Sequence, residues 1–587
     1  MTLEKINSPQ DLKNLQIDEL KTLANEIRQA IIKKVNITGG HMAPNLGIVE
    51  TTIAFHKVFD SPKDKIVFDV SHQCYPHKIL TGRKDGFLEE ENYYKYTGYL
   101  APEESEHDTF KIGHTSTSVS LATGIAKARD LKGEKHNVVA LIGDGSLSGG
   151  EAYEGLNNAA VLNSNIIIIV NDNEMSIAEN QGGLYKNLRF LRETQGKAEC
   201  NFFKALGFDY HYLEEGNNVE KLIELFSKVK DTPRPTVLHI HTLKGCGLPL
   251  AEANKECFHW ILPHTLDNFD NPTQAYEDYT SITANYILEK AQKDKTIVAI
   301  TAATPGVHGF TKEFREKMGS QFVDVGIAEE HAVAYASAIA KNGGKPIFAV
   351  MSSFVQRTYD QISQDLCLNN SPITMLVYWG GLSGADSTHL CSFDMAMLGN
   401  IPNLVYLAPT NKEEHLAMLE WSINQTEHPV AIRIPNCELT SCGVADLTNY
   451  SLLNKYQLTE QGESVAILGL GTYYQKAKNF KDYLREKTGI NATLINPKFI
   501  TGLDEELLNS LKANHKLVVT LEDGCLDGGF GEKIARFYGK TDVKVLNFGG
   551  KKEFTESIPM NILEQRYHLT NELIFENVQE VLKVSVK

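Results

Sequence analysis

The runs VVALIGDG at residues 138–145 and IIIIVNDNEMS at residues 166–176 decide the fold class of this chain. Each is a short, continuous apolar stretch that ends in polar residues or glycine, which is typical of a strand buried in a parallel sheet. The two strands bring Asp144 and Asn173 to their carboxyl ends, the edge at which open α/β sheets bind ligands. The sequence therefore predicts a parallel α/β domain with a polar site at that edge.

The residue types at this edge favour a divalent metal ion that carries a diphosphate. Asn173 follows Gly145 by 28 residues, and Mg²⁺ is commonly held by one or two protein oxygens together with phosphate oxygens and water. Gly143 and Gly145 allow the backbone to turn tightly beside Asp144, and a helix expected over residues 151–160 would point its N-terminal dipole at the phosphate. Taken alone, GDG is equally consistent with an ordinary strand-ending turn, and the paired spacing favours the metal site.

The same apolar runs recur along the whole chain and alternate with helical patterns. Strands are expected at residues 66–70, 138–142, 166–170, 236–240, 297–301, 347–351, 373–378, 465–469, 492–496 and 517–521. Alternation of strands and helices is typical of parallel α/β domains. At the N-terminus, Ser8-Pro9 predicts the start of a helix that continues through the leucines and isoleucines from Leu12 to Ile32.

The order of these patterns predicts three α/β domains, each with a mostly parallel sheet flanked by helices. A polar stretch that contains Pro249, Pro263 and Pro272 separates the first strand group from the second, and a third group starts near Lys455. We therefore expect domains at residues 1–272, 273–447 and 448–587.

Composition excludes several functional classes. The 587 residues carry a formal net charge of -16, which disfavours a nucleic-acid or membrane-surface partner because such partners select basic patches. The nine cysteines include no CxxC pair and are odd in number, which suits free thiols in a reducing compartment better than a disulfide framework. The chain has no apolar run long enough for a membrane span, so a cytoplasmic protein is expected.

Several longer motifs appear in a fixed order. They are GGH at 39–41, NLG at 45–47, VSHQ at 70–73, YPHKILTGR at 75–83, GHTSTS at 113–118, IAE at 327–329 and QR at 356–357 with YDQ at 359–361. With the GDG motif, this set resembles the thiamine diphosphate enzymes and, more closely, the 1-deoxy-D-xylulose-5-phosphate synthases of the transketolase superfamily. The resemblance implies a transketolase-like fold with diphosphate-binding, pyrimidine-binding and C-terminal domains. It also implies thiamine diphosphate and Mg²⁺ as cofactors, a homodimer, and a role in isoprenoid and thiamine biosynthesis.

The resemblance also assigns cofactor-binding residues. They are Gly143, Asp144, Gly145, Ser146, Ser116, Thr117, Asn173, Met175, Lys244 and Phe354, of which Asp144, Asn173 and Met175 are expected to ligate the metal ion. Other interpretations stay open for some of them. A Ser/Thr cluster also caps helices, a lysine between loop residues is usually solvated, and Phe354 is an equally good core aromatic.

Glu329 is the predicted catalytic carboxyl. In the superfamily a glutamate pairs with the aminopyrimidine ring of the cofactor, and a poorly hydrated site would raise its proton affinity. Glu330 follows at once and stays an alternative, because a glutamate at a helix N-terminus is also stabilised by the helix dipole. Histidines are the usual proton shuttles near neutral pH, and the motif positions of His41, His72, His259 and His389 match active-site histidines of the family.

The chain departs from the family at two positions expected to bind the acceptor phosphate. Trp379 and Asn436 stand where the resemblance leads us to expect arginines. The predicted substrate-binding residues are Tyr359, Asp386, Arg357 and Arg433. The segment over residues 177–208, which covers the active site in the family, is also shorter than usual.

The resemblance implies an enzyme that decarboxylates pyruvate and transfers the two-carbon unit to an aldehyde such as glyceraldehyde 3-phosphate, giving 1-deoxy-D-xylulose 5-phosphate. A transketolase-like ketol transferase with a different, possibly unphosphorylated acceptor is the alternative. A third interpretation is a cofactor-binding relative with little catalysis that serves as a partner or regulator. The intact Glu329, His41 and His72 argue against this third interpretation.

Overall fold

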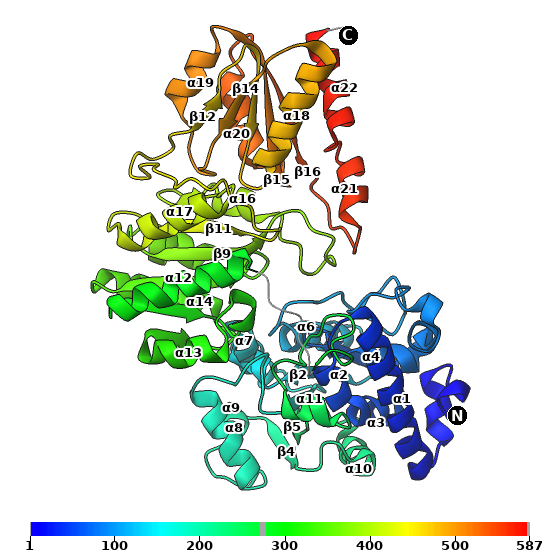
Figure 1. The fold of residues 1–587 in the computed structure, drawn as a ribbon. Helices are drawn as coiled ribbons and strands as arrows, with labels where there is room; N and C mark the ends of the chain where they lie inside the picture. Colours follow the sequence, from blue (N-terminus) through cyan, green and yellow to red (C-terminus); the bar gives the residue numbers. More distant parts are fainter. Residues whose placement is uncertain (1, 270–276, 584–587) are drawn as a thin grey trace. The chain divides into compact units, whose positions relative to one another are not determined.

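The computed structural model describes residues 2–269 and 277–583. The described residues form two compact units: the first contains the residues up to 269 together with Gly326–Ala328, and the second contains the rest. Figure 1 shows three sheets with helices on their faces, and the strand pairing gives sheets of five, six and five strands. The predicted fold class of three α/β domains is confirmed. The expected boundary at 272/273 lies outside the described residues, and the one at 447/448 stays a prediction.

The sheet of the first unit is parallel throughout and has the strand order β1-β2-β3-β5-β4. Its strands are β1 (Lys65–Phe68), β2 (Val138–Gly143), β3 (Ile167–Asp172), β4 (Asp209–Leu213) and β5 (Thr236–His241). Successive residues of β2 and β3 enter two different cores: Val139, Leu141, Ile167 and Ile169 enter one, whereas Val138, Ala140, Ile168 and Val170 enter the other. This period of two explains the continuous apolar runs, because both faces of the sheet are covered.

Helices cover both faces of this first sheet (Figure 1). They are α1 (Ile17–Thr38), α2 (Ala43–Gly47), α3 (Val49–Val58), α4 (Tyr75–Lys78), α5 (Asp85–Leu88), α6 (Ser118–Leu131), α7 (Gly150–Ala159), α8 (Gly183–Glu193), α9 (Phe202–Leu206), α10 (Val219–Val229) and α11 (Pro249–Ala253). The predicted continuous N-terminal helix is wrong in one respect. The segment Pro9–Asn14 is a separate 3-10 helix, and α1 begins at Ile17 because the backbone is extended at Leu15 and Gln16.

The second sheet is also parallel, with the order β10-β11-β9-β8-β6-β7. Its strands are β6 (Ile297–Thr301), β7 (Phe322–Asp324), β8 (Lys345–Met351), β9 (Thr374–Gly380), β10 (Val405–Leu407) and β11 (Val430–Pro435). The accompanying helices are α12 (Tyr279–Lys293), α13 (Lys312–Met318), α14 (Glu329–Lys341), α15 (Tyr359–Gln361), α16 (Asp394–Leu398) and α17 (Lys412–Asn424).

The third sheet has the order β12-β14-β13-β15-β16, in which only the edge strand β12 is antiparallel to its neighbour. Its strands are β12 (Gln457–Glu460), β13 (Ser464–Gly469), β14 (Thr493–Asn496), β15 (His515–Cys525) and β16 (Lys544–Gly550). Its helices are α18 (Tyr473–Thr488), α19 (Glu505–Leu511), α20 (Phe530–Tyr538), α21 (Met560–Arg566) and α22 (Asn571–Leu582).

All ten expected strands are present, whereas β4, β7, β10, β11, β12 and β16 were not predicted. Strands β4, β7, β10, β12 and β16 lie at sheet edges, where short or half-polar sequences are tolerated. Strand β11 is central, but Arg433 interrupts its apolar run. None of the helices described over residues 2–269 and 277–583 is long and apolar enough to cross a membrane.

Candidate active site

The first unit places Asp144 and Asn173 at the ends of neighbouring strands β2 and β3, as predicted. The Asp144 carboxylate is 1 % exposed and accepts a hydrogen bond from Asn180 Nδ2 at 2.6 Å. Burial raises the pKa of Asp144 well above its ordinary value, and the negative charge of the nearby Asp172 adds to this increase. A hydrogen bond from the Asn173 backbone amide to the Asp144 carboxylate opposes it. A carboxylate in this position is strongly stabilised by a cation, so the site fits a metal ion.

The donor set at this edge is poor in carboxylates. Among the residues described, no group of three or more His, Cys, Asp or Glu side chains is arranged to hold a metal ion. Asn173 Oδ1 accepts a hydrogen bond from the Met175 amide at 3.2 Å, so the amide and the Met175 backbone lie together. This arrangement offers few protein oxygens, which suits an ion such as Mg²⁺ that takes further oxygens from phosphate and water.

Lys244 supplies a buried positive charge near this edge. Its side chain is 1 % exposed, and its Nζ donates to the Ser176 carbonyl at 2.6 Å. Burial lowers the pKa of Lys244 to about 7, and the charge of Asp144 opposes this shift. Ser176 also lies against Gly145, where a Cβ would come within 3.0 Å of Ser176 Cα. A side chain larger than that of glycine would therefore be packed tightly against Ser176 at this turn.

The predicted diphosphate loop is folded around Ser116, which adopts a φ of +77°. Its amide donates to Asp69 Oδ1 at 2.8 Å, and its Oγ donates to the Ser146 carbonyl at 2.8 Å. The neighbouring Thr117 Oγ1 is buried and has no hydrogen-bond partner within the described chain. A Cβ on Gly143 would meet no heavy atom within 4 Å. An unsatisfied hydroxyl and open space beside Gly143 both fit a bound polar ligand.

Three of the four predicted histidines lie together in the first unit. The ring centroids of His41 and His72 are 5.1 Å apart, those of His41 and His259 are 5.6 Å apart, and those of His72 and His259 are 5.3 Å apart. Asn45 Nδ2 donates to the His41 and His72 carbonyls at 2.8 Å each and so holds the two loops together. Burial, followed by the charge of Lys244, lowers the pKa of His259 well below its ordinary value, which keeps this ring neutral.

Glu329 is the first residue of α14 in the second unit and is 3 % exposed. Its Oε2 has no hydrogen-bond partner in the described part of the chain, and Arg357 Nη1 lies 3.8 Å away, beyond hydrogen-bond distance. Burial raises the pKa of Glu329 to about 7, although the Arg357 charge opposes this shift. Glu330 is partly exposed. Burial therefore favours Glu329 over Glu330 as a proton-transfer group.

Other predicted residues of the second unit surround His389. The Phe354 and His389 ring centroids are 5.8 Å apart, and Asp386 Oδ1 lies 3.4 Å from His389 Nδ1. Burial alone would raise the pKa of Asp386, but the His389 hydrogen bond and charge lower it to about 2. Tyr359 is partly exposed and donates to Asn400 Oδ1 at 2.8 Å. Thr388 Oγ1 lies 2.8 Å from His389 Nδ1 and donates to Asp386, so Thr388 and Asp386 together orient His389. Tyr359 is held by Asn400, which is not one of the predicted residues.

Arg433 is bound by carboxylates of its own chain. Its Nε and Nη2 donate to Asp394 at 2.7 and 3.0 Å, and its Nη1 donates to Asp523. The guanidinium is buried, and a Cβ on Gly380 would overlap it. The predicted role of Arg433 as a substrate ligand requires breaking this pairing, so the geometry favours a structural role.

Trp379 and Asn436, which stand where arginines were expected, lie near the adjoining ends of β9 and β11. Strands β9 and β11 pair in parallel, with Ile434 opposite Tyr378 and Pro435 opposite Gly380, so the register skips Trp379. Trp379 has a φ of +62° and is 37 % exposed, and Asn436 is exposed directly after β11. This edge therefore presents an aromatic ring and an amide in place of the two positive charges.

The sequence did not predict several buried residues of the first unit that lie near Asp144 and Asn173 or in the same sheet. Asp172 is fully buried, accepts from His239 Nε2 at 2.8 Å and pairs with Arg192 Nη1 at 2.5 Å. Burial would raise the pKa of Asp172, but the hydrogen bond and charge of His239, followed by Arg192, lower it to about 2. Asp69 follows β1 and could have been found by the same strand-end signal as Asp144, whereas His239 lies inside an apolar strand and gave no signal.

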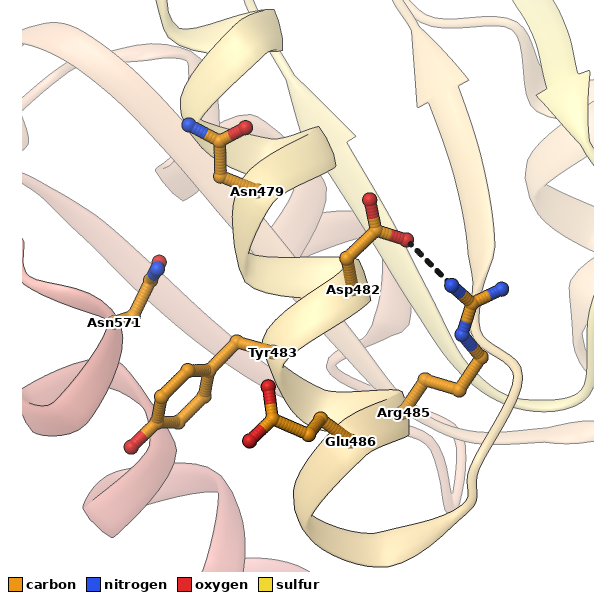
Figure 2. Close-up of a pocket in the computed structure, with 6 residues that line it drawn as sticks. All are labelled: Asn479, Asp482, Tyr483, Arg485, Glu486 and Asn571. Carbon is orange, nitrogen blue, oxygen red and sulfur yellow. Dashed lines mark ion pairs between the residues drawn. The ribbon is translucent and has the colours of Figure 1, made fainter.

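A groove of about 680 Å³ lies between α18 and the start of α22 (Figure 2). It is lined by Asn479, Asp482, Tyr483, Arg485, Glu486 and Asn571, and Asp482 pairs with Arg485 at 3.4 Å. None of the predicted site residues lines this groove. It is polar and open to solvent, and we assign it no part in the chemistry described above.

Comparison with known proteins covers almost the whole chain. The family description "1-deoxy-D-xylulose-5-phosphate synthase" matches residues 3–200, the transketolase pyrimidine-binding domain matches residues 277–440, and the transketolase C-terminal domain matches residues 454–574. The first match includes β1, β2 and β3 of the first sheet, and the other two matches include the whole second and third sheets.

Relatives that match nearly the whole chain are named 1-deoxy-D-xylulose-5-phosphate synthase. The 1-deoxy-D-xylulose-5-phosphate synthases of Caldanaerobacter subterraneus subsp. tengcongensis and of Dictyoglomus thermophilum are each 39 % identical to this chain and cover 99 % of both chains. That of Clostridium tetani is 37 % identical over 99 % of this chain and 100 % of its own. The chain therefore belongs to the 1-deoxy-D-xylulose-5-phosphate synthase family and is an enzyme of the transketolase class.

Proposed function

We propose that this protein joins a two-carbon unit from pyruvate to the aldehyde carbon of glyceraldehyde 3-phosphate, giving 1-deoxy-D-xylulose 5-phosphate and carbon dioxide. One carbon–carbon bond of pyruvate breaks as carbon dioxide leaves, and one carbon–carbon bond forms to the aldehyde. Full-length relatives named for this synthase support the reaction. The structural observation that carries the proposal is Glu329, a buried carboxyl with a pKa of about 7 and an oxygen that has no hydrogen-bond partner in the described chain.

Thiamine diphosphate with Mg²⁺ is the proposed cofactor. When bound, it supplies a carbon nucleophile that stabilises the negative charge left by decarboxylation. Asp144, the Asn173 amide and the Met175 carbonyl would hold the metal ion, and Lys244 would add a positive charge on the diphosphate side. The N-terminus of α7, which begins at Gly150, and the unsatisfied Thr117 hydroxyl would support the same group.

Glu329 is proposed to hold and return a proton at a nitrogen of the aminopyrimidine ring. Its poorly hydrated surroundings keep the proton affinity high enough for transfer near neutral pH. Arg357 at 3.8 Å limits that increase. Phe354 is proposed to pack against the pyrimidine.

The histidines are proposed to move protons on the substrate. His41, His72 and His259 form one cluster in the first unit, and the neutral His259 ring is able to donate one hydrogen bond and to accept another. His389 is oriented by Asp386 in the second unit. A homodimer in the cytoplasm is the proposed form of the enzyme, and isoprenoid and thiamine biosynthesis are the proposed uses of its product.

A second candidate function concerns the acceptor. Arg433 is paired with Asp394 and Asp523, and the neighbouring strand ends present Trp379 and Asn436. Because arginine binds phosphate by a charged, two-pronged contact that neither tryptophan nor asparagine provides, this edge favours a less charged aldehyde. The candidate is a ketol transferase of the transketolase type with an unphosphorylated acceptor.

Incubation of the purified protein with thiamine diphosphate and Mg²⁺ separates these functions. Pyruvate with glyceraldehyde 3-phosphate should release carbon dioxide and form 1-deoxy-D-xylulose 5-phosphate in equal amounts. A ketose phosphate donor that is cleaved without carbon dioxide release would support the ketol transferase instead. No turnover with either donor, despite bound cofactor, would contradict both.

A further inference from the structure

Asn180 is hydrogen-bonded to the predicted metal ligand Asp144. Its Nδ2 donates to Asp144 Oδ2 at 2.6 Å, a short hydrogen bond to a buried carboxylate. Its Oδ1 is shielded from solvent and accepts no hydrogen bond within the described chain. Among the described residues, Asp144 is therefore the hydrogen-bond partner of this side-chain amide.

Tyr185 contacts the same turn through the backbone. Its hydroxyl lies 3.1 Å from the Asp144 carbonyl and 3.2 Å from the Gly145 carbonyl, and it donates to this pair. Tyr185 is in the first turn of α8, five residues after Asn180. One short segment thus fixes both the carboxylate and the main chain of Asp144.

Arg192 connects the other end of α8 to the second strand of the site. Its Nη1 pairs with Asp172 at 2.5 Å and its Nη2 with Glu174 at 3.0 Å, the two residues on either side of Asn173. Asp172 is fully buried, so this pairing is far better shielded from water than a surface ion pair. Residues 180–192 therefore connect the Asp144 turn and the Asn173 turn across the end of the sheet.

We propose that Asn180 and Tyr185 are positioning residues that orient Asp144 for the metal ion. The inference rests on the proposed function, because the ion would arrive with the diphosphate. Mg²⁺ requires near-ideal octahedral geometry, so a carboxylate free to rotate binds it less well than one held in place. Hydrogen bonds from residues behind a metal ligand typically change metal affinity by roughly 10–100-fold.

The test is calorimetric titration of the intact protein with Mg²⁺ at saturating thiamine diphosphate, followed by the same titration with Ca²⁺. Asn180→Ala and Tyr185→Phe should each raise the Mg²⁺ dissociation constant by about 10-fold or more. The Ca²⁺ constant should rise less, because Ca²⁺ accepts irregular geometry. A general loss of structure would weaken the binding of both ions equally.

Matched controls come from the same region. Asn187 on α8 is likewise a hydrogen-bonded asparagine, which donates to the Cys200 carbonyl at 2.9 Å and accepts from the Phe202 amide at 3.1 Å, but neither of these bonds is to Asp144. Asn187→Ala should leave both metal constants unchanged. Tyr153→Phe removes the hydroxyl of a partly exposed tyrosine on α7 and is the control for Tyr185→Phe.

The outcomes separate this inference from the proposed function. If the wild-type protein binds no thiamine diphosphate with Mg²⁺, the proposed function fails. If wild type binds normally, and Asn180→Ala and Tyr185→Phe match it within twofold for Mg²⁺ or lose Mg²⁺ and Ca²⁺ affinity equally, the positioning role is overturned. If Asn180→Ala does not fold, Tyr185→Phe decides the matter, because it removes a single oxygen atom.

Discussion

Two buried acidic side chains, Asp172 in the first unit and Glu329 in the second, are held in different ways. In the first unit, Asp172 accepts from His239 and pairs with Arg192, and Asp144 accepts from Asn180. In the second unit, Glu329 is equally buried, yet its Oε2 has no hydrogen-bond partner within the described residues. The partnered Asp172 has a pKa of about 2, whereas the pKa of Glu329 is about 7.

This difference separates binding from proton transfer. A buried carboxylate paired with a cation, as Asp172 is with Arg192, stays ionised and fixed, which suits the support of a cation site. A buried carboxyl with an oxygen that accepts no hydrogen bond within the described residues, as in Glu329, exchanges its proton near neutral pH, which suits acid–base catalysis. The proposed cation-binding residues thus belong to the first unit, and the proposed proton-transfer residue Glu329 belongs to the second.

The largest expected effect comes from removing the Asp144 carboxylate of the first unit. Asp144→Ala should abolish Mg²⁺-dependent thiamine diphosphate binding in a calorimetric titration, because the ion loses its only predicted carboxylate ligand. Asp209→Ala, on the edge strand β4, is a suitable control for loss of one acidic residue. Unchanged affinity in Asp144→Ala would remove the metal assignment.

The next largest effect is expected at Trp379 and Asn436 in the second unit, on the Michaelis constant for the aldehyde acceptor. Two missing arginine contacts, each worth about 1.5–3 kcal/mol, predict a Michaelis constant for glyceraldehyde 3-phosphate raised by roughly two to four powers of ten. Trp379→Arg combined with Asn436→Arg should lower this constant and leave that for unphosphorylated glyceraldehyde unchanged. A low micromolar constant in the wild-type protein would contradict this prediction.

Much of this contrast was visible in the sequence, but not all of it. The apolar runs ahead of Asp144 and Asn173 predicted both strands and the edge they share, because burial on both faces leaves a continuous pattern. The partners of Arg433 were not predictable, since Asp394 and Asp523 are 39 and 90 residues away along the chain. The choice between Glu329 and Glu330 likewise depends on burial, which packing decides.

Substitution of Arg433 tests whether its ion pairs with Asp394 and Asp523 stabilise the folded protein. Arg433→Met should leave Asp394 and Asp523 buried without their cation and cost about 3–5 kcal/mol of stability. Differential scanning calorimetry should show a clearly lowered melting temperature. A variant that melts like wild type but binds the phosphorylated acceptor poorly would restore Arg433 as a substrate ligand.

The smallest expected effect is the pH dependence of stability from Glu329. The folded protein holds this proton up to a pKa of about 7, against an ordinary value of 4.5. Its contribution to stability is therefore present below pH 4.5 and is lost as the pH rises towards 7, by at most about 3 kcal/mol.

Glu329→Gln should consequently melt at a higher temperature than wild type at pH 8, and this advantage should shrink at pH 5. Glu522, whose pKa burial also raises to about 7, is present in both proteins, so the difference isolates Glu329. A melting-temperature difference that is constant from pH 5 to pH 8 would contradict the raised pKa.

The division between binding and proton transfer is tested most directly by exchange of the thiazolium proton of bound thiamine diphosphate, followed by quenched-flow NMR. Glu329→Gln should bind the cofactor with nearly wild-type affinity but exchange this proton at least about 100-fold more slowly. Glu330→Gln should exchange it at the wild-type rate. Rapid exchange in Glu329→Gln, or slow exchange in Glu330→Gln alone, would contradict the assignment of Glu329.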